Sequence, residues 1–122
     1  MMERRPVSLV LVTSCLLNLY ATEHFREITG SLREQVGVAD FVLKEEALFI
    51  HREAPTDGQD EPVPVDLPPF VSEGLVEVLY LQSPDEEATF VDLSAPIDDG
   101  EAVTAALALH RGCSIATDDR KA

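Results

Sequence analysis

Carboxylates at three separated places in the chain could together hold a divalent cation. Glu46 follows an apolar segment, Glu101 lies in the first turn of an alanine-rich segment, and Asp118 and Asp119 follow the last apolar segment. Mg²⁺ prefers oxygen ligands and keeps several of its waters, so a few carboxylates at one place can bind it. Such an ion orients a water molecule, lowers its pKa and neutralises charge on a phosphate. The corresponding chemistry is phosphodiester hydrolysis without a nucleophilic side chain.

Each of these acids also has a structural explanation. Glu101 could complete a capping box with Asp98, and Asp118 and Asp119 could stabilise a helix N-terminus through the helix dipole. Glu46 could be a solvated surface residue, as most glutamates are. Spacing alone therefore leaves both a metal site and a purely structural role open.

Four apolar segments are predicted to be strands, over residues 7–12, 38–41, 75–81 and 114–117. The first is rich in Val and Leu and has little polar content, which is typical of a strand buried on both faces of a parallel sheet. Helical segments separate the strands, so we expect an α/β fold whose mostly parallel sheet is flanked by helices. Segments 7–12, 38–41 and 114–117 should be neighbours. Ligands collect at the carboxyl ends of such strands, where the acids lie.

Polar residues that could cap a helix precede four helical segments: Ser14, Thr22, Ser83 and Asp98. The segment after Thr22 is predicted to continue to Gly37, because glycine suits the left-handed conformation that ends many helices. Gly112 is predicted to end the last helix in the same way. A further helix is predicted over residues 43–52. Residues 53–69 mix prolines with acids and are predicted to form an acidic, proline-rich loop.

Four segments of the sequence resemble PIN domains, the family that includes the VapC-like ribonuclease toxins of toxin–antitoxin pairs. They read LVLVTSCLLNL from Leu9, VLKEEA from Val42, DDGEA from Asp98 and ATDDRKA from Ala116. Their order and separation also match, and the resemblance runs through essentially the whole chain. It implies a Rossmann-like three-layer fold, RNA as the substrate, and four acids around Mg²⁺ or Mn²⁺.

The resemblance assigns roles to individual residues. Glu46 matches the second acid of the family, Glu101 the third and Asp119 the fourth, with Asp118 as the alternative. Glu46, Glu101 and Asp119 would be the catalytic residues, and all four would be metal ligands. Polar residues beside them would support the site: Thr13, Ser14, Asp98, Asp99 and Arg120.

Two departures from the family pattern weaken the expected activity. The family's first acid ends the first strand, but Val12 occupies that position and offers a metal no oxygen. Thr13 or Ser14 could supply a hydroxyl, but a neutral ligand does not replace the charge of a carboxylate. The sequence also stops at Ala122, where a PIN domain usually continues through a helix and a final edge strand. We therefore expect a weak or inactive relative of magnesium-dependent endoribonucleases.

Composition and charge restrict the ways in which the protein could bind its partners. The 122 residues carry a formal net charge of −14, which argues against a broad basic patch for nucleic acid. The length and the 45% of hydrophobic residues fit one folded domain over residues 1–122. No segment is long enough to span a membrane. Arg111 and Arg120, among the few cations near the proposed site, could position a phosphate or be surface charges.

Two other functions stay open at this point. A non-catalytic domain could still bind an antitoxin-like protein or a second copy of itself as a homodimer. An acidic lipoprotein is the other possibility, because the sequence VTSC at residues 12–15 loosely resembles a lipoprotein cleavage box. Cys15 and Cys113 have neither metal-ligand nor disulfide spacing. They fit a reducing compartment, so we expect the protein to be cytoplasmic.

Overall fold

The computed structural model describes residues 6–47, 49–53 and 60–117 of the chain. Four parallel strands form its main sheet, in the order β5-β2-β1-β6. They are β1 (Val7–Leu11), β2 (Gln35–Ala39), β5 (Val76–Leu79) and β6 (Ser114–Ala116). The expected α/β fold with a parallel sheet is confirmed. The first, second and last predicted strands are neighbours, as expected, because β1 pairs with β2 on one side and with β6 on the other.

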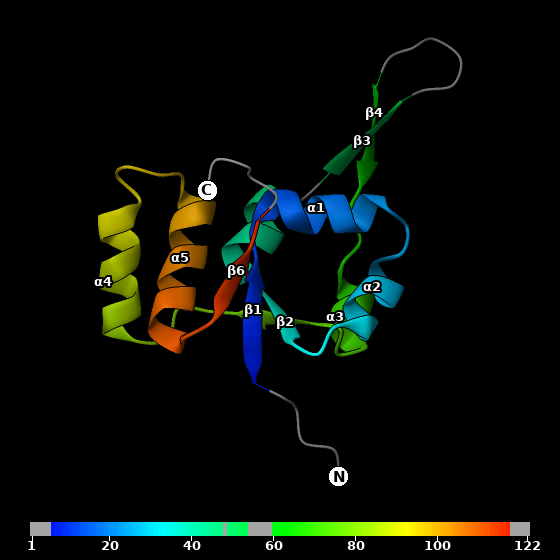
Figure 1. Cartoon of the computed structure of the whole chain (residues 1–122). Coiled ribbons are helices and arrows are strands. Elements are labelled where there is room, and N and C mark those ends of the chain that lie inside the picture. The colour runs from blue at the N-terminus through cyan, green and yellow to red at the C-terminus, as the bar shows by residue number, and fades with distance from the viewer. Residues whose placement is uncertain (1–5, 48, 54–59, 118–122) are drawn as a thin grey trace.

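Helices cover both faces of the sheet and complete a three-layer, Rossmann-like arrangement (Figure 1). One layer holds α1 (Thr13–Ala21), α2 (Phe25–Ser31) and α3 (Pro68–Ser72), and the other holds α4 (Pro84–Leu93) and α5 (Asp99–Arg111). The chain moves across the sheet from β1 through β2 to β5, and then returns past both to β6. Because parallel crossovers are right-handed, this change of direction puts the later helices on the opposite face.

Valine side chains of the strands form the centre of the core. Val10, Val36, Val38 and Val76 are at most 1% exposed, and Leu107 of α5 packs against them fully buried. Consecutive residues of β2 are buried, because helices cover the sheet on both faces. A strand in this position has no alternation of apolar and polar residues, so its sequence marks its ends poorly.

Gly37 corrects the prediction for the second strand. It does not end a helix but lies in the middle of β2, which begins three residues earlier than predicted. A Cβ atom at this position would lie 2.7 Å from Cγ1 of Val7 and 2.9 Å from Cδ1 of Leu79. Glycine is therefore needed for the close packing of β2 against its neighbours, and not for a left-handed turn. The preceding helix α2 ends at Ser31.

The helix predicted over residues 43–52 is also wrong. A single π-helical turn, η1 (Val42–Glu46), follows β2 and closes with a 2.7 Å hydrogen bond from the N–H of Ala47 to the carbonyl of Val42. Strand β3 (Phe49–Glu53) comes next and pairs in antiparallel fashion with β4 (Asp60–Pro64). This hairpin extends away from the main sheet (Figure 1).

The predicted acidic loop over residues 53–69 contains regular structure at two places, β4 and α3. Residues 60–64 form β4, an edge strand of the kind that tolerates proline. Pro68 and Pro69 open α3, where the missing N–H groups cost nothing because a first turn has no partners for them. The six residues 54–59 lie outside the part of the chain that the structure describes.

Of the four polar residues predicted to cap helices, two do so and two do not. The Ser83 hydroxyl accepts a hydrogen bond from the N–H of Glu86 at the start of α4, and Asp98 does the same for Glu101 at the start of α5. Gly112, with a φ of +67°, ends α5 as predicted. Neither Ser14 nor Thr22 caps a helix. The N-cap residue of α1 is Val12 and that of α2 is His24, and neither side chain makes a capping hydrogen bond.

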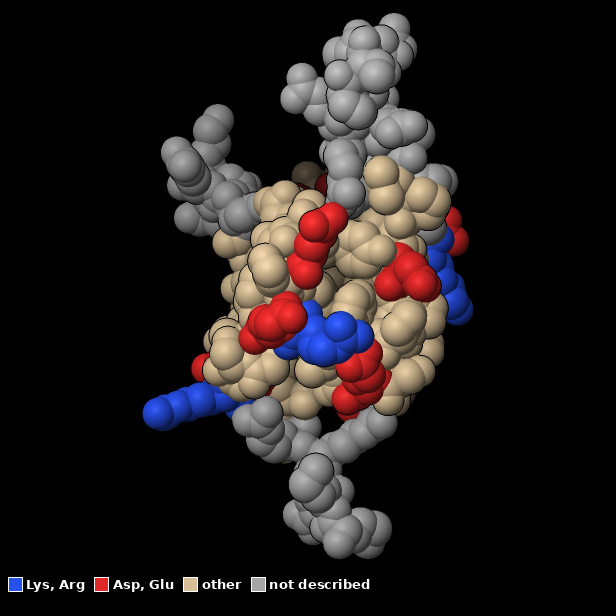
Figure 2. Space-filling view, turned by 90° about the vertical axis from the view of Figure 1, so that its right-hand side faces the viewer, with Lys and Arg blue, Asp and Glu red and all other residues tan. Residues whose placement is uncertain are grey.

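The face covered by α1, α2 and α3 has its charges dispersed. Figure 2 shows basic side chains next to acidic ones on this face, with no broad basic patch over the described residues. The guanidinium of Arg26 donates two hydrogen bonds to the Glu73 carboxylate, at 2.7 and 2.6 Å, and lies over the Phe70 ring. These contacts fix α3 against α2, so this cation has a structural role.

Two observations bear on the membrane and lipoprotein hypotheses. No helix in the described ranges combines the length and the apolar character needed to cross a bilayer. Cleavage before Cys15 would remove β1, a central strand that pairs with both β2 and β6.

Candidate functional site

The carboxyl ends of β1 and β6 meet at the point where the order of the sheet reverses. From β1 the chain proceeds to β2 on one side, and it returns to β6 on the other side. In open α/β sheets such a switch point is the place where ligands bind. An open hollow of about 630 Å³ lies here, which we call the switch-point hollow. The described residues that line it are Val12, Thr13, Ser14, Leu17, Glu46, Asp98, Glu101 and Thr117.

Glu46 reaches this hollow from the last position of η1. The hydroxyl of Thr13 donates a short hydrogen bond to its Oε1, and the side chain is half-buried. The carboxyl group also lies directly against Gly100, the second residue of α5, where a Cβ atom would collide with it. Three elements, η1, α1 and α5, therefore determine the position of one carboxylate.

Glu101 and Asp98 line the same hollow from the start of α5. The Oδ1 atom of Asp98 accepts a 2.9 Å hydrogen bond from the N–H of Glu101, so Asp98 is the N-cap of this helix. The side chain of Glu101 is exposed. Asp98 thus has the structural role that its sequence position suggested, and Glu101 presents a carboxylate on the same hollow as Glu46.

Val12 connects β1 to α1 and lines the hollow with an apolar, half-buried side chain. Its N–H donates to the carbonyl of Ala116 at 3.1 Å, and its own carbonyl accepts from the N–H of Leu16 at 3.0 Å. The backbone is therefore held between β6 and the first turn of α1. A carboxylate at position 12 would belong to the same hollow as Glu46 and Glu101.

The other predicted site residues divide into three groups. Ser14 lines the hollow. Asp99 is exposed on α5 and is not among the lining residues. Asp118, Asp119 and Arg120 lie outside the described residues, although Thr117, which precedes them, lines the hollow. Within the described ranges, no group of three or more His, Cys, Asp or Glu side chains is placed to hold a metal ion.

Arg111 does not serve the site in this structure. It lies at the C-terminal end of α5, whereas the hollow is at the N-terminal end. Its guanidinium donates to Glu86 at 2.9 Å and to the carbonyl of Tyr80. The hydrogen bond from Arg111 holds the pKa of the buried Glu86 at about 2, against the opposing effect of burial. Arg111 is thus neither at the hollow nor a solvated surface charge, because it is half-buried in an ion pair with a buried carboxylate.

Gly100 is the site residue that sequence reasoning missed. Glycine destabilises a helix relative to alanine, so a glycine in the first turn of this alanine-rich helix was the one sequence feature that could have indicated a special role. Its explanation is the Glu46 carboxyl group, which packs where a side chain would be.

Comparisons with protein-family models, with curated proteins and with solved structures found no match to this chain.

Proposed function

We propose that this protein is a PIN-type ribonuclease domain whose metal site is weakened by the valine at position 12. The observation that carries the proposal is the pair of carboxylates, Glu46 and Glu101, on one hollow at the switch point of a parallel sheet. Their positions along the chain are those at which the resemblance expects metal ligands. The reaction would be hydrolysis of a phosphodiester bond in single-stranded RNA.

The donor set fits a hard, largely hydrated cation such as Mg²⁺ or Mn²⁺. Mg²⁺ is commonly held by one or two carboxylates, with waters and substrate phosphates completing its coordination. Glu46 and Glu101 supply two carboxylates, and Asp98 has already used one oxygen to cap α5. When bound, the ion would activate a water molecule and neutralise charge on the phosphate.

The residues of the chain would divide the remaining tasks. Thr13 would orient Glu46 through its hydroxyl, and Gly100 would leave space for that carboxylate. Val12 would contribute neither charge nor a metal ligand, so affinity for the ion should be low. Asp119, or Asp118 in its place, would add a further acid beyond Thr117. The hollow is wide and open, which suits an extended single strand.

Cleavage of a mixed-sequence single-stranded RNA in Mn²⁺ tests the proposal. Wild type should cleave slowly, and Val12→Asp should be at least about a hundredfold faster, because a lost ligand costs a few kcal/mol and each 1.4 kcal/mol is tenfold. Glu101→Gln in the Val12→Asp background should remove the gain. Val12→Asn is the matched control, because it adds an oxygen without the charge. Equal rates for wild type and Val12→Asp would contradict the proposal.

A non-catalytic interaction domain is the second candidate function. The observation that favours it is the apolar side chain of Val12 in the hollow, since an apolar group suits contact with protein better than a hydrated ion. This candidate predicts that no variant of Val12 gains RNA cleavage.

A further inference from the structure

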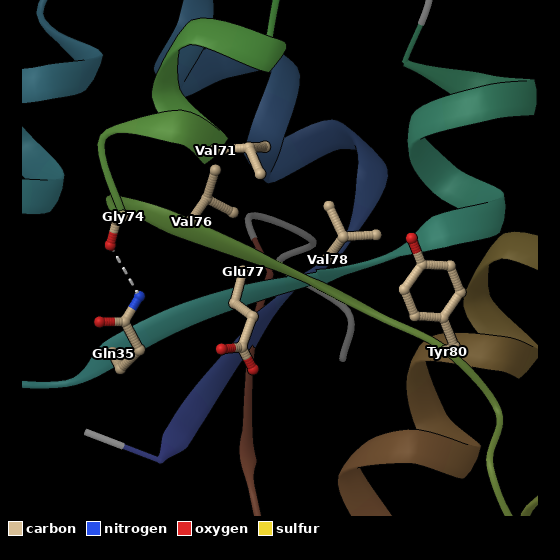
Figure 3. A pocket seen from close by; sticks show the side chains of 7 residues that line it. All are labelled: Gln35, Val71, Gly74, Val76, Glu77, Val78 and Tyr80. Atoms are coloured by element: carbon tan, nitrogen blue, oxygen red, sulfur yellow. Dashed lines mark hydrogen bonds between the residues drawn. The ribbon is translucent and has the colours of Figure 1, made fainter. Parts of the chain in front are cut away.

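Among the described elements, helix α4 packs mainly against α5. Figure 1 shows it on the far side of α5 from β1 and β6. Arg111 of α5 donates to the buried Glu86 of α4 and to the carbonyl of Tyr80, the residue that follows β5 (Figure 3). The hydroxyl of Thr89 lies 2.7 Å from Nε2 of His110. These contacts fix one side of α4 and leave its opposite side facing outward.

The outward side of α4 has an apolar centre. Pro84, Ala88 and Val91 lie there together, because residues three or four positions apart share one face of a helix. All three are exposed, and Val91 is 64% exposed. Glu86, by contrast, is buried on the side that meets α5. The apolar centre therefore belongs to the surface and not to the core.

Carboxylates border this apolar centre on both sides. Asp85 and Asp92, seven positions apart, lie on one side of it, and Glu87 lies on the other. Each is exposed, and within the described ranges none of the three side chains takes part in an ion pair or a hydrogen bond. The helix itself contains no Lys or Arg. We call this surface the outer face of α4 and define it by six residues: Pro84, Asp85, Glu87, Ala88, Val91 and Asp92.

The stability of the helix explains only part of this pattern. Asp85 and Glu87 lie in the first turn, where negative charges interact favourably with the helix dipole. Asp92 lies in the last turn, where a negative charge is unfavourable, and no basic residue stands three or four positions away within the helix to offset it. Asp92 therefore has no stabilising role in its own helix, and its charge, next to the exposed Val91, is suited to an external partner.

The spacing on the outer face specifies the shape of that partner. Positions 84, 88 and 91 follow the alternation of four and three residues that forms the seam of a coiled coil, and positions 85, 87 and 92 flank this seam. Charges at flanking positions form ion pairs with the facing helix and determine which helix pairs. The backbone of α4 makes its hydrogen bonds within the helix, so it offers no edge on which a strand could pair. The matching occupant is a helix that lies alongside α4.

Charge decides between a second copy and a different protein. A second α4 would place three more carboxylates against Asp85, Glu87 and Asp92, and each copy has a net charge of −14. Both effects oppose a dimer at this face. Nucleic acids and anionic membranes are repelled for the same reason. A helix that carries Lys or Arg is attracted.

We propose that the outer face of α4 binds a basic, amphipathic helix of a partner protein. Apolar side chains of that helix pack over Ala88 and Val91, and its Lys or Arg residues pair with Asp85 and Asp92 on one side and with Glu87 on the other. Because α4 has only 10 residues, the contact is small and the binding is weak and reversible. This site is independent of the metal site proposed above.

The test uses the full chain and a blocked, alanine-rich peptide of about 16 residues, which is long enough to form a helix. Leu residues occupy its seam positions and Lys residues flank them. The control peptide has the same composition, with Leu and Lys redistributed evenly around the helix, so its charge is identical. Calorimetry at low salt should give at least about tenfold tighter binding for the amphipathic peptide, because only that peptide matches both the centre and the borders of the face. In NMR spectra, the amide signals of α4 should shift most when it binds.

Matched protein variants locate the site. Asp92→Lys should weaken binding of the amphipathic peptide at least about fivefold, whereas Glu34→Lys, the same charge change at an exposed position before β2, should weaken it by less than about twofold. Asp92→Lys should fold normally, since a positive charge suits the last turn of a helix. Val91→Gln leaves the charge unchanged and should weaken binding at least about threefold, because it removes the apolar contact.

Four results would overturn the proposal. Equal affinity for the two peptides would indicate general charge attraction, and so would unchanged binding in Val91→Gln. Equal losses in Asp92→Lys and Glu34→Lys would place the binding site elsewhere than on α4. A wild-type dimer in sedimentation that Asp92→Lys alters would assign this face to a second copy.

Discussion

The hydroxyl of Thr13 donates a hydrogen bond to the carboxylate of Glu46, 33 positions later in the sequence. Thr13 opens α1 directly after the valine that follows β1, and Glu46 ends the π-helical turn after β2. This contact joins the carboxyl ends of the two central strands. It also fixes one of the two carboxylates on which the proposed metal site depends.

Thr13→Val should remove this hydrogen bond and lower the free energy of unfolding by about 1.5 to 3 kcal/mol, as is usual for hydrogen bonds to charged groups. Urea unfolding at neutral pH measures the change. Thr13→Ser retains the hydroxyl and is the control. If Thr13→Val and Thr13→Ser are equally stable, the hydroxyl does not hold Glu46 in solution.

Gly100→Ala tests the contact between α5 and the Glu46 carboxyl group. Alanine favours a helix over glycine by up to about 1 kcal/mol, so the substitution alone should stabilise the protein. The new Cβ atom must displace the Glu46 carboxyl group, which should cancel part or all of that gain. In the Glu46→Ala background the full gain should return. A double-mutant cycle on urea unfolding measures this coupling. Additive effects would show that the two residues do not touch.

The contrast between Gly100 and Asp98 shows what the sequence could predict. Asp98 caps α5 through a bond to a residue three positions away, so a local motif was sufficient to place it. The same holds for Ser83 and Glu86. Gly100 depends on Glu46, which lies on another element, and no local pattern reports such a contact.

The predicted strand boundaries were wrong for the same reason, because they depend on contacts between elements that are distant in sequence. Gly37 resembles a helix end in sequence, but its role comes from the side chains of Val7 and Leu79 on two neighbouring strands. The prolines of β4 indicated a loop and most of β3 was predicted to be helical, and only the pairing of these two segments makes them strands. The alternation of strands and helices was sufficient for the fold class, because it depends on apolar segments that are local in sequence.

The pair of Glu86 and Arg111 should dominate the acid sensitivity of the fold. Glu86 has a pKa of about 2 in the folded protein, below its ordinary value of 4.5, mainly because Arg111 donates to it. Its stabilising effect is therefore complete above about pH 4.5, and it disappears as the pH falls toward 2. Glu86→Gln should lower the free energy of unfolding by about 2 to 3 kcal/mol at pH 7.

Unfolding curves between pH 2 and pH 7 measure this difference. Wild type and Glu86→Gln should converge as the pH falls from about 4.5 to about 2. Glu87→Gln, at the exposed neighbouring position, should stay close to wild type throughout. A constant difference between wild type and Glu86→Gln at all pH values would mean that charge pairing is not the cause.

Val12 holds the N-cap position of α1 without a side-chain hydrogen bond. Val12→Asn can supply that bond and should raise the free energy of unfolding by up to about 1 kcal/mol. Val12→Asp should gain less in the absence of metal, because its charge adds to those of Glu46 and Glu101 on the same hollow. Urea unfolding in the presence of a metal chelator measures the free energy of unfolding of both variants. Equal gains for the two variants would place position 12 beyond the influence of these acids.

The most direct test of the proposed cation site is calorimetric titration of Mn²⁺ into wild type, Val12→Asp and Val12→Asn. We predict that Val12→Asp binds Mn²⁺ at least about a hundredfold more tightly than wild type, because it adds both a charge and an oxygen ligand. Val12→Asn should gain much less, and Glu101→Gln should remove most of the gain of Val12→Asp. If Val12→Asp binds Mn²⁺ no more tightly than Val12→Asn, the switch-point hollow is not a metal site.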